Sequence, residues 1–342
     1  MRYILIIILM SILTPAFAQS ALSEQSIELG KVHWLRQFDQ ALEVAQQNDK
    51  PVFILFQEVP GCSTCRNYGQ QVLSHPLLVE AIETLFVPLA IHNNKGGADA
   101  KVLKHYNEPS WNNPVVRIVS ADKTDLIPRV SGNYSRLGLA EAMIFALQRA
   151  DKDVPVYLEL LCDEWRAAHS GTETATLSMY CFWTGEKTYG QLDGVVSTRA
   201  GFMHGREVVA VEFNPEVVSL ESLIEKGKAA RCADQVFVND AAQKSKAAKA
   251  IDQSHIKNSS TFRPDSEPKY YLSKTHYRYV PMTELQAARA NALLGQGKSP
   301  ESVLSVRQVR LADYIRRHRN EQWTSAIGQN FLRAWSRVEE EL

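Results

Sequence analysis

The stretch ATLSMYCFWTGE, residues 175–186, does most to decide the fold and chemistry of this chain. Residues 175–179 are typical of a strand, and Cys181 then stands where a helix is predicted to begin. A cysteine in the first turn of a helix faces unpaired backbone N–H groups and the positive end of the helix dipole, which favour the thiolate. Phe182 and Trp183 would form an apolar wall beside it. The alternative is a buried core thiol, because free cysteine also packs as a small hydrophobic side chain.

Further sequence blocks follow this stretch in a fixed order. They are LDGVVSTRAGF at 192–202, EVVAVEFNP at 207–215, SLESLI at 219–224 and YLSKTHYRY at 271–279. Together they resemble the A-type peptide methionine sulfoxide reductases, whose signatures are Gly-Cys-Phe-Trp-x-x-Glu, Gly-Val-x-Ser-Thr-x-x-Gly-Tyr, Val-x-Phe-Asp-Pro, Ser-Tyr-Glu and Tyr-Leu-x-Lys-x-x-Tyr-x-Tyr. The resemblance spans about residues 172 to 295. It implies a ferredoxin-like α+β domain that reduces the S epimer of peptide methionine sulfoxide.

Reduction of a sulfoxide needs an acid beside the thiolate. The thiolate attacks the sulfur, the oxygen takes up a proton, and the nucleophile is left as a sulfenic acid. In the resembled family the acid is a glutamate before the Phe-Asp-Pro strand end, and counting back from Pro215 places Glu207 there. A carboxyl group beside Phe182 and Trp183 would lose solvation, which favours its protonated form. The alternative for Glu207 is a solvated carboxylate at a strand edge, and Glu186 is predicted to support the site from the helix surface.

The chain departs from the resembled family at several positions. Tyr180 replaces the glycine before the nucleophile, and the short loop at 203–206 has no counterpart of a pocket tyrosine. The family's resolving cysteine falls on Val280. Cys232 is therefore a candidate to attack the sulfenic acid of Cys181, the alternative being an unpaired buried thiol. Either activation and recycling differ from the family, or the site is degenerate.

A second redox motif, VPGCSTC at residues 59–65, lies in the N-terminal half. The apolar run PVFILF at 51–56 predicts a buried strand before it, and an amphipathic stretch follows at 67–78. A Cys-x-x-Cys at a strand-to-helix junction puts Cys62 at the helix N-terminus and Cys65 one turn inside, which suits reversible disulfide chemistry. The alternative is half of a zinc site, but no second Cys-x-x-Cys or paired His follows at ligand spacing.

This half resembles the thioredoxin fold of the thiol-disulfide interchange proteins. The Val-Pro-Gly-Cys-x-x-Cys form also resembles a small thioredoxin-like group in which selenocysteine can occupy the position of Cys62. The segment WNNPV at 111–115 fits the proline that such domains place opposite the Cys-x-x-Cys, commonly in the cis form. Pro114 is thus a predicted supporting residue, and an ordinary trans turn is the alternative.

Composition agrees with a folded redox protein. The 342 residues are 45% hydrophobic and carry a formal net charge of zero, so the chain is long enough for two cores and lacks the basic excess typical of nucleic-acid binding. Residues 1–18 have a basic start, an apolar run and a small-residue cleavage pattern. They predict a cleaved signal peptide, too short for stable membrane insertion, and a periplasmic or secreted protein.

We therefore expect a signal peptide at 1–18, an α/β thioredoxin-like domain at 19–150 and a connector at 151–172. An α+β domain resembling methionine sulfoxide reductase A, with a C-terminal helical extension, would follow at 173–342. Cys162, in the connector, is predicted to be structural or a spare thiol partner.

The predicted activity is that of an oxidoreductase which repairs oxidised envelope proteins under oxidative stress. Cys181 would reduce methionine sulfoxide, and Cys62 and Cys65 would recycle it, with Cys232 as an intermediate. No metal, flavin or nucleotide cofactor is predicted; the partners would be oxidised-Met peptides or proteins and a thiol-disulfide electron donor. Two alternatives stay open: a thiol-disulfide interchange protein whose second domain holds clients, and a non-catalytic binder or sensor of oxidised methionine.

Overall fold

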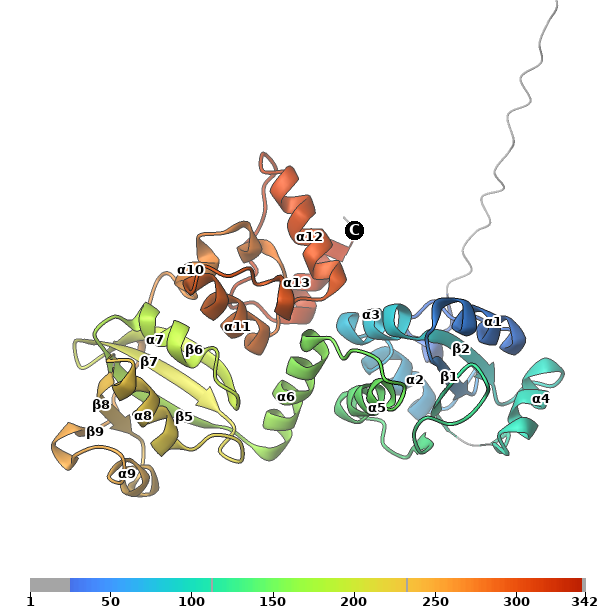
Figure 1. Ribbon diagram of the computed structural model, residues 1–342, viewed down its shortest axis with the longest axis horizontal. Coiled ribbons are helices and arrows are strands. Elements are labelled where there is room, and N and C mark those ends of the chain that lie inside the picture. Colours follow the sequence, from blue (N-terminus) through green and yellow to red (C-terminus); the bar gives the residue numbers. More distant parts are fainter. Residues whose placement is uncertain (1–24, 112, 232, 340–342) are drawn as a thin grey trace, which may run out of the picture.

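The computed structural model describes residues 25–111, 113–231 and 233–339. The predicted signal peptide at 1–18 and Cys232 therefore lie outside the described residues. The chain forms two sheets, each with its own helices, and helix α6, Val156–Ser170, lies between the two domains (Figure 1). Among the described residues, every helix is too short or too polar to cross a membrane.

The first domain is a four-stranded sheet in the order β2-β1-β3-β4. Its elements are η1 Ile27–Leu29, α1 Phe38–Asn48, β1 Val52–Gln57, α2 Ser63–Gln71, α3 Pro76–Leu85, β2 Val87–His92, α4 Ala98–His105, β3 Val115–Val119, β4 Val130–Ser131 and α5 Arg136–Arg149. The strand β1 is parallel to β2, antiparallel to β3 and buried along its whole length, as its unbroken apolar run predicts. This arrangement confirms the predicted thioredoxin fold. The amphipathic stretch at 67–78 is not one helix, because Pro76 begins a separate helix.

The second domain is a six-stranded sheet in the order β10-β6-β7-β5-β8-β9. Its elements are β5 Glu173–Met179, α7 Phe182–Tyr189, β6 Val195–Met203, β7 Arg206–Phe213, α8 Leu220–Ala229, β8 Ala233–Val238, α9 Ala241–Ala247, η2 Gln253–His255, β9 Ile256–Asn258 and β10 Arg263–Pro264. The helices α7 and α8 pack against the sheet through a shared core that includes Leu177, Val209 and Leu223. Mixed α+β architecture was predicted for this half, and the structure confirms it.

The C-terminal residues form a third group of helices. They are α10 Tyr270–Ser273, η3 His276–Tyr279, α11 Glu284–Gly295, η4 Glu301–Val303, α12 Val306–Arg317 and α13 Phe331–Val338. Most of them share a core around Leu272, Leu285 and Leu311. The last helix, α13, packs against both groups: Phe331 and Trp335 enter the core of the first domain, whereas Val338 packs against the core of the C-terminal helices.

Hydrogen bonds and an ion pair also connect the C-terminal helices to the first domain. Glu80 of α3 is fully buried, and its carboxylate accepts hydrogen bonds from the Ser305 hydroxyl at 2.6 Å and from the Arg307 backbone N–H at 2.8 Å. Arg307 also forms an ion pair with Glu83. A buried carboxylate with two donors is costly to separate from them, so these bonds hold the domains in a defined docking.

Two candidate thiol redox sites

Cys181 caps the N-terminus of α7. The strand β5 ends at the buried Met179, Tyr180 is 93% exposed, and Cys181 has extended backbone angles before the helix starts at Phe182. The thiol therefore stands at the end of a helix where backbone N–H groups are unpaired, as the sequence predicted. Cys181 is half-buried, so it is not the buried core thiol of the alternative interpretation.

Glu207 lies next to this cysteine because of the sheet register. The strands β5 and β7 are antiparallel, and Ser178 pairs with Val208, which brings the start of β7 to the end of β5. The half-buried Glu207 carboxylate accepts a hydrogen bond from the Phe182 backbone N–H at 3.0 Å. The carboxyl group of the predicted acid therefore lies one peptide unit from Cys181.

An aromatic cluster forms the apolar wall beside the thiol. Phe182 contacts the rings of Trp183 and Phe202, with centroids 5.5 and 5.4 Å apart. Trp183 donates from its indole nitrogen to Asp265 at 3.2 Å, and the Tyr270 ring stacks on it at 3.7 Å and 13°. Such close, parallel stacking fixes the indole plane, so the wall is preformed.

Tyr270 and the neighbouring Tyr271 are site residues that sequence reasoning missed. Burial raises the pKa of Tyr271, and the negative charge of the nearby Cys181 thiolate raises it further. A phenol that stays protonated beside the nucleophile can donate a hydrogen bond to a bound sulfoxide oxygen. The signal was present in the block at 271–279, which was used only to recognise a resemblance.

The position of Glu186 contradicts the predicted one. It was expected on the helix surface, but it is fully buried and lies 3.3 Å from the Thr198 hydroxyl and 3.4 Å from the Lys269 ammonium. Glu186 is one turn after Phe182, so both face the sheet. The buried ion pair joins α7 to the segment that carries Tyr270, and thereby positions the stacked rings.

The second site is the Cys62 and Cys65 pair. Cys62 caps α2 and is exposed, whereas Cys65 is buried one turn later, with 3.7 Å between the two sulfur atoms. A hydrogen bond from the Cys65 backbone N–H lowers the pKa of Cys62, and burial raises the pKa of Cys65 to about 12. An exposed thiolate beside a protected thiol is the arrangement that attacks a disulfide first and resolves it second.

Hydrogen bonds from Gln57 and to Glu28 hold the turn before Cys62, and sequence reasoning missed both residues. The buried Glu28 carboxylate accepts the Gly61 N–H at 2.9 Å, and Gln57 donates to the carbonyls of Glu28 and Cys65 at 2.7 and 3.1 Å. Burial alone would raise the pKa of Glu28, but bonds from Ser26 and Gly61 lower it overall. A side chain on Gly61 would meet the Glu58 carbonyl at 2.5 Å, so glycine is required there.

The segment with Pro114 lies opposite the cysteine pair, as predicted. The Cys62 thiol donates to the Asn113 side-chain oxygen at 3.1 Å. The expectation of a cis bond before Pro114 is wrong, because among the described residues the one cis peptide bond is Val59–Pro60.

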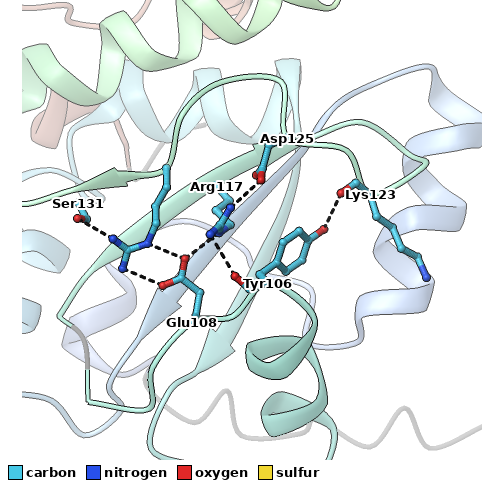
Figure 2. A network of polar contacts seen from close by, with 7 residues as sticks. Tyr106, Glu108, Arg117, Lys123, Asp125 and Ser131 are labelled. Atoms are coloured by element: carbon cyan, nitrogen blue, oxygen red, sulfur yellow. Dashed lines mark hydrogen bonds and ion pairs between the residues drawn. The ribbon is translucent and has the colours of Figure 1, made fainter.

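A charged network supports the loop that leads to this segment. The Glu108 carboxylate accepts bonds from Arg117 of β3 at 2.8 Å and from Arg129 at 2.7 Å, and Arg117 also pairs with Asp125 at 2.7 Å (Figure 2). Burial would raise the pKa of Glu108, but the hydrogen bonds from the two guanidinium groups lower it overall. The network fixes the start of the loop, so that its end can present Asn113 to Cys62.

Glu58 brings a carboxylate to the cysteine pair. The possible ligand atoms of Glu58, Cys62 and Cys65 all lie within 4.8 Å of one another. The zinc alternative thus gains a third ligand, while structural zinc sites are almost always four-coordinate. The same carboxylate stands where it can accept the proton of the Cys65 thiol, which the redox interpretation requires.

The structure does not bring the two thiol sites together. Figure 1 shows α2 in the first domain and α7 in the second, with α6 between the domains. The predicted intermediate, Cys232, lies outside the described residues. Cys162 of α6 is 2% exposed in the core of the first domain, and burial raises its pKa to about 12, so it is a structural thiol in this arrangement.

Comparison with known proteins finds two kinds of similarity, each over part of the chain. Residues 33–121 match the family described as thioredoxin-like. Peptide methionine sulfoxide reductase MsrA of Vibrio vulnificus is 33% identical over 104 residues, and the match covers 25% of this chain and 50% of that protein. The chain joins a thioredoxin-like domain to an MsrA-like segment.

Two further relatives were found. MsrA of Methanococcus maripaludis is 33% identical over 73 residues, covering 16% of this chain and 46% of that protein. The chain thus spans about half the length of these curated relatives. A solved structure described as DsbH oxidoreductase is 15% identical with a TM-score of 0.31, covering 38% of this chain and 94% of that one.

Proposed function

We propose that this protein is a thiol oxidoreductase that reduces methionine sulfoxide, as the S epimer, in peptides and proteins. The observation that carries the proposal is the half-buried Glu207 carboxylate bonded to the backbone N–H that follows Cys181, at a helix N-terminus. The aromatic wall of Phe182 and Trp183 suits the apolar methyl and methylene groups of methionine. Residues 1–18 support a periplasmic or secreted location, where such repair meets oxidised envelope proteins.

The first step transfers one oxygen atom. The Cys181 sulfur bonds to the sulfoxide centre while Glu207 supplies a proton to the sulfoxide oxygen. The oxygen then passes to the Cys181 sulfur: a new S–O bond forms there while the original S–O bond and the transient sulfur–sulfur bond break. Methionine is restored, Cys181 becomes a sulfenic acid, and the proton of the Cys181 thiol replaces the one that Glu207 gave. The net reaction consumes a thiol and a sulfoxide and yields a sulfenic acid and a thioether, so the protons balance.

Recycling needs two further thiols. A second thiol condenses with the sulfenic acid, which forms a disulfide and releases water. We infer that Cys62 then attacks this disulfide and that Cys65 resolves the mixed species, so that the pair is oxidised and Cys181 is reduced. The pair must be the stronger reductant, and a difference of about 30 mV already shifts the exchange tenfold.

Docking of the domains makes the route of this transfer testable. While Glu80 holds Ser305 and Arg307, α2 and α7 stay in separate places. Transfer within one chain then requires the docking to open, and Glu80→Ala should accelerate it. Transfer between two copies predicts instead a rate that rises with protein concentration and is unchanged in Glu80→Ala.

The main test is dithiothreitol-driven reduction of each epimer of a methionine sulfoxide peptide. We expect turnover of the S epimer that Cys181→Ser abolishes and that the control Cys62→Ser retains, because dithiothreitol replaces the internal dithiol. Activity retained in Cys181→Ser would refute the proposal. Binding of the oxidised peptide without any turnover would instead show a sensor of oxidised methionine.

The alternative function, thiol-disulfide interchange, is favoured by one observation. Cys62 is exposed with a lowered pKa, beside the protected Cys65, and this pair can act on disulfides without the second domain. It predicts that Cys181→Ser keeps full activity toward a disulfide substrate. Loss of that activity in Cys62→Ser, but not in Cys162→Ser, would assign the exchange to this pair.

A further inference from the structure

A groove in the C-terminal helices is lined by Lys274, which contacts the aromatic wall of the Cys181 site through Tyr270. It has a volume of about 710 Å³ and lies between the segment from α10 to η3 and the C-terminal end of α12 with the loop that follows. The side chains that matter here are those of Lys274, Arg278, Tyr279, Arg319, Glu321 and Trp323. The residues that line this groove take no part in the proposed reduction of the sulfoxide or in the recycling of Cys181.

Lys274 connects this groove to the aromatic wall. Its ammonium lies 5.0 Å from the centre of the Tyr270 ring, close enough for a cation–π contact, and it also pairs with Glu267 at 2.6 Å. The Tyr270 ring in turn stacks on Trp183, which is two residues from Cys181. Lys274 therefore belongs both to the lining of the groove and to a series of contacts, through Tyr270 and Trp183, that ends two residues from Cys181.

The groove carries an excess of positive charge. Neither Arg278 nor Arg319 has a carboxylate partner within the part of the chain that the structure describes. Arg278 donates to the Ser273 carbonyl at 3.2 Å, and its Nε is buried without a partner. The carboxylate that lines the groove is that of Glu321, so cations outnumber anions.

His276 does not add to this charge near neutral pH. Burial lowers its pKa, and the nearby Arg316 and Arg319 lower it further, against the opposing effect of Asp313 and Glu301. The charge of the groove is thus set by its lysine and arginine side chains rather than by His276. Guanidinium groups without a carboxylate partner of their own are suited to carboxylates, which they bind through paired hydrogen bonds.

We propose that this groove binds the acidic flank of an oxidised peptide, with Arg278 and Arg319 as the residues that recognise its Asp or Glu side chains. The inference rests on the proposed function and adds a substrate class to it: methionine sulfoxide in acidic sequence contexts. Tyr279 and Trp323 supply apolar surface for the stems of those side chains.

The test compares two peptides that differ only in the residues around methionine sulfoxide, Glu in one and Lys in the other. We expect the wild type to prefer the Glu peptide by about tenfold in kcat/KM, and Arg319→Glu to remove most of that preference, as expected for a few charge pairs at a partly exposed surface. Arg310→Glu is the matched control, because Arg310 is exposed on α12, the helix that ends before Arg319, and does not line the groove. N-acetyl methionine sulfoxide, which has no flanking residues, should be reduced equally by all three proteins.

Binding separates failure of this inference from failure of the proposed function. Fluorescence anisotropy of the Glu peptide with unoxidised methionine needs no turnover and should show weaker binding to Arg319→Glu than to wild type. Arg278→Gln provides a second variant that removes the charge with a smaller change in shape. Equal affinity of all variants, or equal preference for the Lys peptide, would overturn the groove as a recognition site even in an active enzyme. Selective binding in an inactive protein would support the groove and refute the reductase.

Discussion

Replacing Glu207 with glutamine tests the acid beside Cys181, because the amide keeps the shape and loses the transferable proton. Two effects can be separated by size. The Phe182 N–H, at 3.0 Å, exchanges a charged acceptor for a neutral one, which costs about 1 kcal/mol of stability. Loss of a general acid lowers the rate by about 100- to 10,000-fold, or about 3 to 5.5 kcal/mol of activation free energy. The variant should therefore stay folded while its chemical step nearly stops.

The assay is a single turnover with one equivalent of methionine sulfoxide peptide, followed by trapping of the Cys181 sulfenic acid and mass spectrometry. Glu212→Gln is the matched control, because Glu212 lies on the same strand but accepts bonds from Thr172 and Ser197 at 2.8 and 3.1 Å. It should react at the wild-type rate. A Glu207→Gln rate within threefold of wild type, or an equal loss in Glu212→Gln, would refute the assignment of the acid.

Three further predictions concern the first domain. Iodoacetamide should modify Cys62 at pH values below the range of a free cysteine, because its pKa is lowered, whereas Cys65 should stay unreactive until the pH nears 12; equal reactivity would contradict the thiol assignment. Glu58→Gln should slow release of a mixed disulfide at Cys62 by about tenfold or more, measured by stopped flow, and an unchanged rate would remove Glu58 as the base. Glu80→Ala should destabilise the protein by about 2 kcal/mol or more in urea unfolding, since two donors lose their acceptor, and an unshifted midpoint would show that the docking is not held there.

The sequence predicted those parts of the sites that depend on local pattern. An unbroken apolar run followed by Cys-x-x-Cys placed Cys62 at a strand-to-helix junction, because a central parallel strand is buried on both faces. The position of Glu207 followed from a motif count, and the structure supplies the reason: the pairing of β5 with β7 leaves one register in which both core faces are buried. The order and spacing of residues along a strand are the same in the sequence and in the fold, so the position of Glu207 could be counted from the sequence.

The parts that could not be predicted depend on partners far along the chain. Glu186 was expected at the surface because a carboxylate on a helix normally faces water. It is buried because Lys269, 83 residues later, enters the same space and pairs with it. The stacking of Tyr270 on Trp183 and the packing of α13 against the first domain have the same origin. Such contacts are fixed by tertiary packing, which no local pattern contains.

Under the proposed function, the docking of the two domains bears on how long a sulfenic acid at Cys181 would survive. In the docked arrangement the Cys62 pair is in another domain, so a newly formed sulfenic acid at the half-buried Cys181 would have to wait for Cys62 to reach it. A sulfenic acid that waits is exposed to a second oxidation, which yields an irreversible sulfinic acid. The stacked Trp183 and Tyr270 rings and the buried Glu186 pair hold an apolar wall beside the cysteine, which would shield a sulfenic acid on that side. Because the reductant is held in another domain, the aromatic wall would have to protect the sulfenic acid until the reductant arrives. The lifetime of the trapped sulfenic acid measures that protection.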